Sequence, residues 1–204
     1  GSRTLVPQSN VAAEFPNHAS YADLVAMVTF ADGSQVAMQT DGRMAFNISD
    51  SCGSFASSGS YRRLTIASGC RSGSVNVSAV LTVGAASVST TATFGVVWLS
   101  SLELRLYYQD SSTAYSSSQL KYRYACSSPS PAFHMLRVKT FGTLTSGLSA
   151  QVSSGAAYSV SGGALSGSGS VRTLTVTSPG TVTIGVAASP DPDGVGDSTS
   201  LEAM

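Results

Sequence analysis

Residues 60–83 read SYRRLTIASGCRSGSVNVSAVLTV, and their pattern returns 110 residues later, where residues 170–186 read SVRTLTVTSPGTVTIGV. In each copy an apolar run leads through a glycine-containing turn into an alternating apolar strand. A second, weaker similarity lies about 30 residues before each copy, where residues 24–30 read LVAMVTF and residues 135–141 read MLRVKTF. A long-period repeat made only of strand-like pieces predicts two tandem β domains.

The composition is compatible with packed cores in a chain of low charge. Of 204 residues, 42% are hydrophobic and 11% are charged, the formal net charge is zero, and Ser and Thr make up more than a quarter of the chain. Length and repeat favour two domains, 1–97 and 98–204. Zero net charge argues against nucleic acid as a partner. No run of 18 apolar residues occurs, so we expect a membrane connection only through a segment outside this sequence.

Alternation and turn signals predict short strands in both domains. In the first we expect strands at 21–30, 36–38, 44–48, 64–66, 75–83 and 88–97. Asp41-Gly42 predicts a hairpin between 36–38 and 44–48, and 52–60 is expected to be a loop. In the second we expect strands at 102–106, 120–126 and 135–141, then Ser- and Gly-rich turns, the repeated pair, and a closing strand from near Thr199.

The second domain carries the stretch SPGTVTI at 178–184, and the segment 155–188 around it resembles bacterial Ig-like group 2 domains of invasin- and intimin-like adhesins. The first domain is less similar to this family, because it has Gly69-Cys70-Arg71 at the position where the second domain has the Pro-Gly turn. The junction, Val97-Trp98-Leu99 followed by alternating leucines, is similar to the interdomain segment of TMEM132-like Ig arrays in eukaryotic surface proteins.

This resemblance implies an all-β fold of two tandem Ig-like β-sandwich domains, an extracellular or cell-surface location, and no catalytic residues. The sequence also has no G-x-S-x-G nucleophile elbow and no phosphate-binding loop. We therefore expect no enzyme activity and no cofactor, but a non-catalytic adhesion or recognition module of a larger surface protein. Its partner would be another cell-surface protein or a glycan. The alternatives are a structural spacer and a dedicated glycan-binding module.

The chain contains three cysteines. Cys52 and Cys70 flank one predicted strand of the first domain, and a disulfide between them would fit an oxidising compartment. The alternative is two buried thiols. Cys126 is the odd cysteine, either a buried side chain or one that pairs outside this sequence. Three cysteines without suitably spaced histidines do not predict a zinc site.

Two glycosylation sequons occur, Asn47-Ile48-Ser49 and Asn76-Val77-Ser78. Such triplets arise easily by chance in a Ser/Thr-rich chain. Alternation nevertheless turns both asparagines outward, where a glycan would not disturb the core.

A set of cations alternates outward in the second domain. If their strands share a sheet, one face gathers Arg105, Lys121, Arg123, Arg137 and Lys139. Such a face could bind an anionic partner, such as a sulfated glycan or an acidic protein. The alternative is a solvated strand face whose lysines discourage edge-to-edge aggregation.

An aspartate-rich stretch, PDPDGVGDS at 190–198, resembles thrombospondin type 3 calcium repeats through Asp191, Asp193 and Asp197. Calcium requires six to eight oxygen ligands, which three carboxylates, carbonyls and waters could supply. Pro-Asp-Gly is also ordinary turn chemistry, so a simple loop is the alternative.

Overall fold

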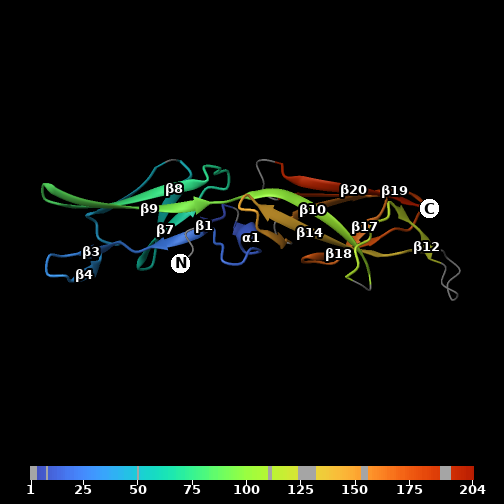
Figure 1. Ribbon diagram of the computed structural model, residues 1–204, viewed down its shortest axis with the longest axis horizontal. Coiled ribbons are helices and arrows are strands. Elements are labelled where there is room, and N and C mark those ends of the chain that lie inside the picture. The colour runs from blue at the N-terminus through green and yellow to red at the C-terminus, as the bar shows by residue number, and fades with distance from the viewer. Residues whose placement is uncertain are drawn as a thin grey trace. The chain divides into compact units, whose positions relative to one another are not determined.

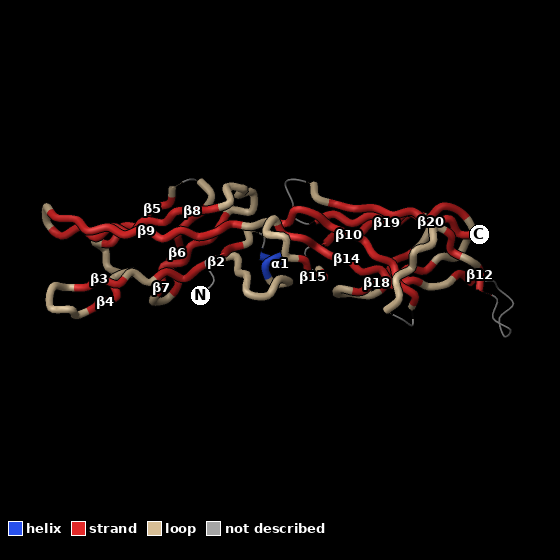
Figure 2. The backbone as a smooth tube through the Cα atoms, viewed as in Figure 1, coloured by secondary structure: helices blue, strands red, loops and turns tan. Residues whose placement is uncertain are grey.

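The computed structural model describes residues 4–7, 9–49, 51–109, 112–123, 132–152, 156–188 and 194–204. Strands dominate these ranges, and the one helix within them, α1 (Ser9–Ala12), has four residues (Figure 2). The chain divides into two compact units, Gly1–Trp98 and Leu99–Met204, which we call unit 1 and unit 2. No helix in the described part of the chain is long and apolar enough to span a membrane.

Unit 1 consists of short strands and two long ones, β8 and β9 (Figure 1). The strands are β1 (Thr4–Leu5), β2 (Tyr21–Leu24), β3 (Met27–Thr29), β4 (Gln35–Ala37), β5 (Met44–Ile48), β6 (Gly53–Ser58), β7 (Tyr61–Ile66), β8 (Ser74–Val83) and β9 (Ala86–Val96). One sheet has the order β1-β9-β8-β5 and a second the order β2-β7-β6, while β3 and β4 pair as a separate hairpin.

The two main sheets of unit 1 pack face to face. Leu64 and Ile66 on β7 share one buried cluster with Val75 and Val77 on β8 and Phe94 on β9. These are the alternating apolar positions of the strands, and the residues between them are polar. Period-two alternation therefore builds the core of a β-sandwich.

Unit 2 has the same kind of construction. Its strands are β10 (Leu99–Tyr108), β11 (Gln119–Leu120), β12 (Tyr122–Arg123), β13 (Ala132–Phe133), β14 (Leu136–Leu144), β15 (Ser149–Gln151), β16 (Ala156–Ser161), β17 (Ala164–Ser166), β18 (Val171–Thr175), β19 (Gly180–Ala188) and β20 (Gly196–Ala203). One sheet has the order β10-β14-β18-β17 and the other β11-β20-β19-β16. Leu136 and Leu174 from the first meet Val182, Ile184 and Leu201 from the second in one buried cluster.

The two units share one strand order. The sheet β1-β9-β8-β5 corresponds to β11-β20-β19-β16, and β2-β7-β6 corresponds to β14-β18-β17. In each unit a two-residue strand, β1 or β11, pairs in parallel with the last strand, as Leu5 opposite Val96 and Leu120 opposite Ala203. This order is that of immunoglobulin-type sandwiches, so the prediction of an all-β, Ig-like sandwich fold is confirmed.

The prediction of one strand over 21–30 is wrong. Residues 21–24 belong to β2 and residues 27–29 to β3, because the chain leaves the sheet at Ala26, whose carbonyl accepts the N–H of Met38 at 2.8 Å. The hairpin turn lies at Asp32-Gly33, between β3 and β4. The predicted hairpin at Asp41-Gly42 does not form. These residues connect β4, which pairs with β3, to β5, which pairs with β8.

Several segments expected to be loops are strands. β6 lies within the predicted loop 52–60, and β15, β16 and β17 lie in the Ser- and Gly-rich region before the repeated pair. β6 has one large apolar side chain, Phe55, and forms through backbone pairing with β7, which composition does not reveal. The predicted strand 120–126 is interrupted after β11, because β12 pairs with β13 in a separate sheet.

Candidate functional site

The predicted disulfide between Cys52 and Cys70 is present in unit 1, with Cα atoms 5.0 Å apart and a separation of 18 positions in sequence. Cys52 precedes β6 and Cys70 follows β7, so the bridge closes the base of the β6–β7 hairpin. Cys70 also belongs to the buried core. Closing a loop of this length stabilises the fold by about 3 kcal/mol in the chain-entropy description. Cys126 lies outside the described residues.

Both sequon asparagines lie on the outer face of the β1-β9-β8-β5 sheet and are exposed. Asn47 on β5 stands opposite Ser78 on β8, which makes Asn76 its diagonal neighbour on the same face, at roughly 7–8 Å. The hydroxyl of Thr93 donates to Oδ1 of Asn76 at 2.7 Å. That contact uses the side-chain oxygen and not the amide nitrogen, the atom that carries an N-linked glycan.

The predicted cations gather only in part. Arg105 on β10 lies directly opposite Lys139 on β14, and Arg137 on β14 lies opposite Tyr107. All four alternate with buried residues and so lie on the outer face of the β10–β14 pair, which we call the cationic face. Lys121 follows β11, a strand of the other sheet, and Arg123 belongs to the small β12–β13 sheet. These two cations therefore lie on different elements from the other three.

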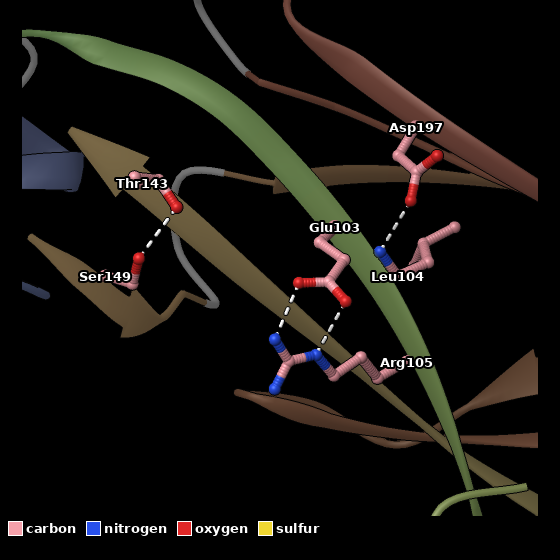
Figure 3. A network of polar contacts seen from close by, with 6 residues as sticks. All are labelled: Glu103, Leu104, Arg105, Thr143, Ser149 and Asp197. Carbon is pink, nitrogen blue, oxygen red and sulfur yellow. Dashed lines mark hydrogen bonds and ion pairs between the residues drawn. The ribbon is translucent and has the colours of Figure 1, made fainter. Parts of the chain in front are cut away.

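The cationic face also includes Glu103 and Phe141, which the pattern of basic residues does not reveal. The guanidinium of Arg105 donates to both carboxylate oxygens of Glu103, through Nε at 2.8 Å and Nη2 at 2.7 Å (Figure 3). Its Cζ lies 4.3 Å from the ring centre of Phe141, and Nζ of Lys139 lies 4.4 Å from that of Tyr107. Both distances fall within the range of cation–π attraction. These partners could have been predicted from the sequence, because residues 103, 105 and 107 alternate outward on one strand and residues 137, 139 and 141 on the other.

The electrostatics of the face follow from these contacts. Three cations and one carboxylate leave a formal charge of +2. The hydrogen bond from Arg105 holds the pKa of Glu103 below its ordinary value of 4.5, and the same contact raises the pKa of Arg105. Both groups are therefore charged at neutral pH, and Glu103 neutralises Arg105 in particular. Arg137 and Lys139 carry the remaining positive charge.

A hollow of about 560 Å³ adjoins the cationic face. It is bounded by Glu103, Arg105 and Tyr107 of β10, by Tyr115 with the following serines, and by Thr199 and Ser200 of β20. Burial raises the pKa of Tyr115, whose hydroxyl donates to the carbonyl of Gln119. Hydroxyl groups and two tyrosines thus line the space together with Leu104, Leu106 and Leu201.

The aspartate-rich stretch is described only in part, since Asp191 and Asp193 lie outside the described residues. Asp197 is the second residue of β20. Its Oδ2 accepts the backbone N–H of Leu104 at 2.7 Å (Figure 3). Its Oδ1 accepts the backbone N–H of Ser198 at 2.8 Å. In the part of the chain that the structure describes, no three His, Cys, Asp or Glu residues form a metal-binding group. The calcium site stays a prediction.

Comparison with known proteins gives no family model and no curated protein that matches the chain. Among solved structures, the chain is similar over its whole length to a chimeric titin Z1Z2 functionalized with a peptide from decorin (12% identity, TM-score 0.35) and to titin domains z1z2 in complex with telethonin (13%, 0.33), covering 91% of each. It is also similar to 28% of an endo-fucoidan hydrolase of glycoside hydrolase family 107 (8%, 0.32). Similarity at this level carries no argument about function, and the fold assignment rests on the strand order.

Proposed function

We propose that this chain is a non-catalytic adhesion or recognition module of a larger extracellular protein, and that it binds an anionic cell-surface protein or glycan through the cationic face. The observation that carries the proposal is the position of Arg105 directly opposite Lys139, with Arg137 beside them. Glu103 offsets the charge of Arg105, and with Arg137 and Lys139 the face keeps a formal charge of +2, which attracts an anion.

The same face is organised to receive an anion. β14 lies between β10 and β18 in the sheet, and Leu136 and Val138, which flank Arg137, are fully buried. The backbone beneath the cations is thus fixed by the core, while Tyr107 and Phe141 hold the two side chains above them in place. Groups positioned before binding lose less conformational freedom when a sulfate or carboxylate arrives.

An extracellular location is supported by the disulfide, since such bridges persist in oxidising compartments. The exposed sequons on one face of unit 1 fit the same location. The relation to bacterial Ig-like group 2 domains, or to TMEM132-like arrays, is part of the proposal and rests on the sequence pattern alone.

A glycan is favoured among anionic partners by the hollow beside the face. Its hydroxyl groups and the tyrosines 107 and 115 are the groups that bind saccharide hydroxyls and ring faces, and Arg105 borders both the hollow and the cationic face. The competing function of a different class is a spacer that holds another part of the protein away from a surface. A spacer has no saturable partner.

The test compares two charge reversals in unit 2. Arg137→Glu changes the cationic face, and Lys121→Glu makes the same change at an exposed position on another element. We expect Arg137→Glu to weaken binding to immobilised heparin at least tenfold, and Lys121→Glu to change it less than threefold. Binding of the unaltered chain should weaken with added salt. Equal effects of the two variants would reject the face, and no saturable binding to heparin, to an acidic protein or to cells would favour the spacer.

A further inference from the structure

A pocket of about 450 Å³ lies in unit 1 between the segment 39–46 and the β6–β7 hairpin. Its first wall is the connection from β4 into β5 and the start of β5. Its second wall consists of Ser57, Gly59, Tyr61 and Arg62. Pockets of this size hold small ligands in many proteins.

The pocket lies on the side of the sandwich formed by β5 and β6. These are the last strands of their two sheets, at the ends away from β1 and β2. In unit 2 their counterparts, β16 and β17, are also the last strands, whereas β10 lies beyond β14 at the opposite end of its sheet. A strand equivalent to β10 would therefore lie away from the pocket and would not cover it.

Arg62 borders the pocket with a positive charge that no carboxylate compensates. It lies on β7 two residues before the buried Leu64, so its side chain is on the same, inward face of the strand. Its Nη1 donates to the hydroxyl of Ser57 at 3.2 Å, and its Cζ lies 6.0 Å from the ring centre of Phe55. Within the described part of the chain it has no ion-pair partner. Such a guanidinium can bind a carboxylate through two parallel hydrogen bonds.

Asp41 also borders the pocket, but Arg43 compensates its charge. The Asp41 carboxylate accepts hydrogen bonds from Nε and Nη2 of Arg43 at 3.0 and 2.7 Å, and from the backbone N–H of Arg43 at 2.9 Å. This pair contributes no net charge, so Arg62 gives the pocket a formal charge of +1. An anionic ligand fits this charge better than a neutral or cationic one.

Two residues of the lining contain buried polar atoms without a hydrogen-bond partner among the residues that the structure describes. The atoms are Oε1 of Gln39, an acceptor, and Nε of Arg62, a donor. Nε2 of Gln39 donates to the carbonyl of Ser60 at 2.6 Å, which fixes the orientation of the amide. Buried polar atoms without partners cost stability. A ligand with both a carboxylate and hydroxyl groups would supply an acceptor and donors to these two side chains after a small rotation of each.

We propose that this pocket binds an acidic sugar residue. The carboxylate of the sugar bonds to the guanidinium of Arg62, and its hydroxyl groups bond to the amide of Gln39 and the hydroxyl of Tyr61. A sugar acid fits better than a simple carboxylate because Thr40 and Ser57 add further hydroxyl groups to the lining. The site belongs to unit 1 and uses no residue of the cationic face, so it is a binding site beyond the one proposed for unit 2.

The test is a titration of the isotope-labelled full chain with glucuronic acid at neutral pH, followed by the chemical shifts of the backbone amides. Glucose replaces the carboxylate with a CH₂OH group, and acetate offers the carboxylate alone. We expect saturable shifts within 39–46 and 57–62 for glucuronic acid, and at least tenfold weaker affinity for each control. Equal affinity for either control, shifts confined to the cationic face, or no saturable shift would overturn the proposal. Arg137→Glu should leave these shifts unchanged, so the outcome does not depend on the function proposed for unit 2.

Two matched pairs of variants locate the ligand. Arg62→Gln removes the inward charge, and Arg63→Gln removes that of the next residue, which pairs with Asp23 outside the pocket. Gly42→Leu adds a side chain to the pocket wall and Gly69→Leu adds one elsewhere, and a Cβ at either glycine would meet no atom within 4 Å. We expect at least a tenfold loss of glucuronic acid affinity for the first variant of each pair and less than twofold for the second. Equal effects within the pairs would overturn the proposal, and the glycine pair decides if Arg62→Gln does not fold.

Discussion

The backbone N–H of Leu104 on β10 donates to Oδ2 of Asp197 on β20 at 2.7 Å, joining the first and last long strands of unit 2. The two residues are 93 apart in sequence and belong to different sheets. A carboxylate that accepts two backbone N–H groups thus closes one side of this sandwich.

Replacing Asp197 with Ala should lower the free energy of unfolding by about 1–3 kcal/mol, because the N–H of Leu104 loses its charged acceptor while half-buried. Asp197→Asn should cost less, since its amide oxygen still accepts one hydrogen bond. The measurement is urea unfolding, with Ser200→Ala on the same strand as the control. This variant loses only the exposed hydroxyl contact with Thr183 and should cost about 0.5 kcal/mol. Equal loss for Ser200→Ala and Asp197→Ala would contradict this role.

Removing the disulfide should destabilise unit 1 by about 3 kcal/mol, because the unfolded chain regains the freedom of the 18-residue loop. Cys52→Ser removes the bridge and leaves Cys70 in the core. The urea unfolding midpoint of this variant should equal the midpoint of the unaltered chain measured in the presence of a reductant. A midpoint that reductant does not shift would show that the bridge contributes nothing to stability.

Glu103→Gln should raise the affinity of the cationic face for heparin severalfold, since the formal charge of the face rises from +2 to +3. The effect depends on pH in a defined way. The pKa of Glu103 is lowered by Arg105, so the carboxylate stays charged until the pH falls through this lowered value, below 4.5. The ion pair contributes its small, largely exposed stabilisation above that range and loses it below.

The matched comparison is the ratio of heparin affinities of Glu103→Gln and the unaltered chain, measured from pH 7 to pH 3. Sulfate groups remain ionised throughout, so this ratio should stay constant above pH 5 and fall toward one at the acid end. A ratio near one at neutral pH would show that Glu103 does not limit the charge of the face.

The sequons give a further prediction. Secretion from a eukaryotic host should yield a chain that loses mass on treatment with N-glycosidase, with one glycan fewer in Asn47→Gln and one fewer in Asn76→Gln. Both side chains are exposed, so neither variant should unfold the domain; Asn76→Gln loses the contact with Thr93, worth about 1 kcal/mol. Unchanged mass in both variants would show that the face is unmodified.

The repeat shows how much of the fold could be predicted from the sequence. The segments 60–83 and 170–186 contain β7, β8, β18 and β19, which are equivalent in the two strand orders. The weaker similarity, between residues 24–30 and 135–141, is out of register, because it sets Leu24 against Met135. Ala22 lies opposite Leu64 and Leu136 opposite Leu174, so Ala22 is the counterpart of Leu136. Short alternating strands resemble each other at several shifts, and only pairing fixes the register.

The same limit applies to the candidate site. Alternation correctly turned Arg105, Arg137 and Lys139 outward, because their neighbours in sequence are the apolar residues of the core. It could not tell which strands are neighbours, and so it grouped Lys121 and Arg123 with them. The same limit hides the aromatic partners and Glu103. Phe141 and Tyr107 contact their cations across the β10–β14 pair, and Glu103 contacts Arg105 along β10.

The parallel pairing of the first and last strands has a mechanical consequence. A pull on the two ends of unit 1 loads the β1–β9 hydrogen bonds in shear, so that they must break together, although only two residues of β1 take part. Once the unit opens, the Cys52–Cys70 bridge keeps its 18-residue loop from extending, which withholds roughly 60 Å of chain. An oxidised module therefore stretches less far than a reduced one, and its length under tension reports the redox state of its surroundings.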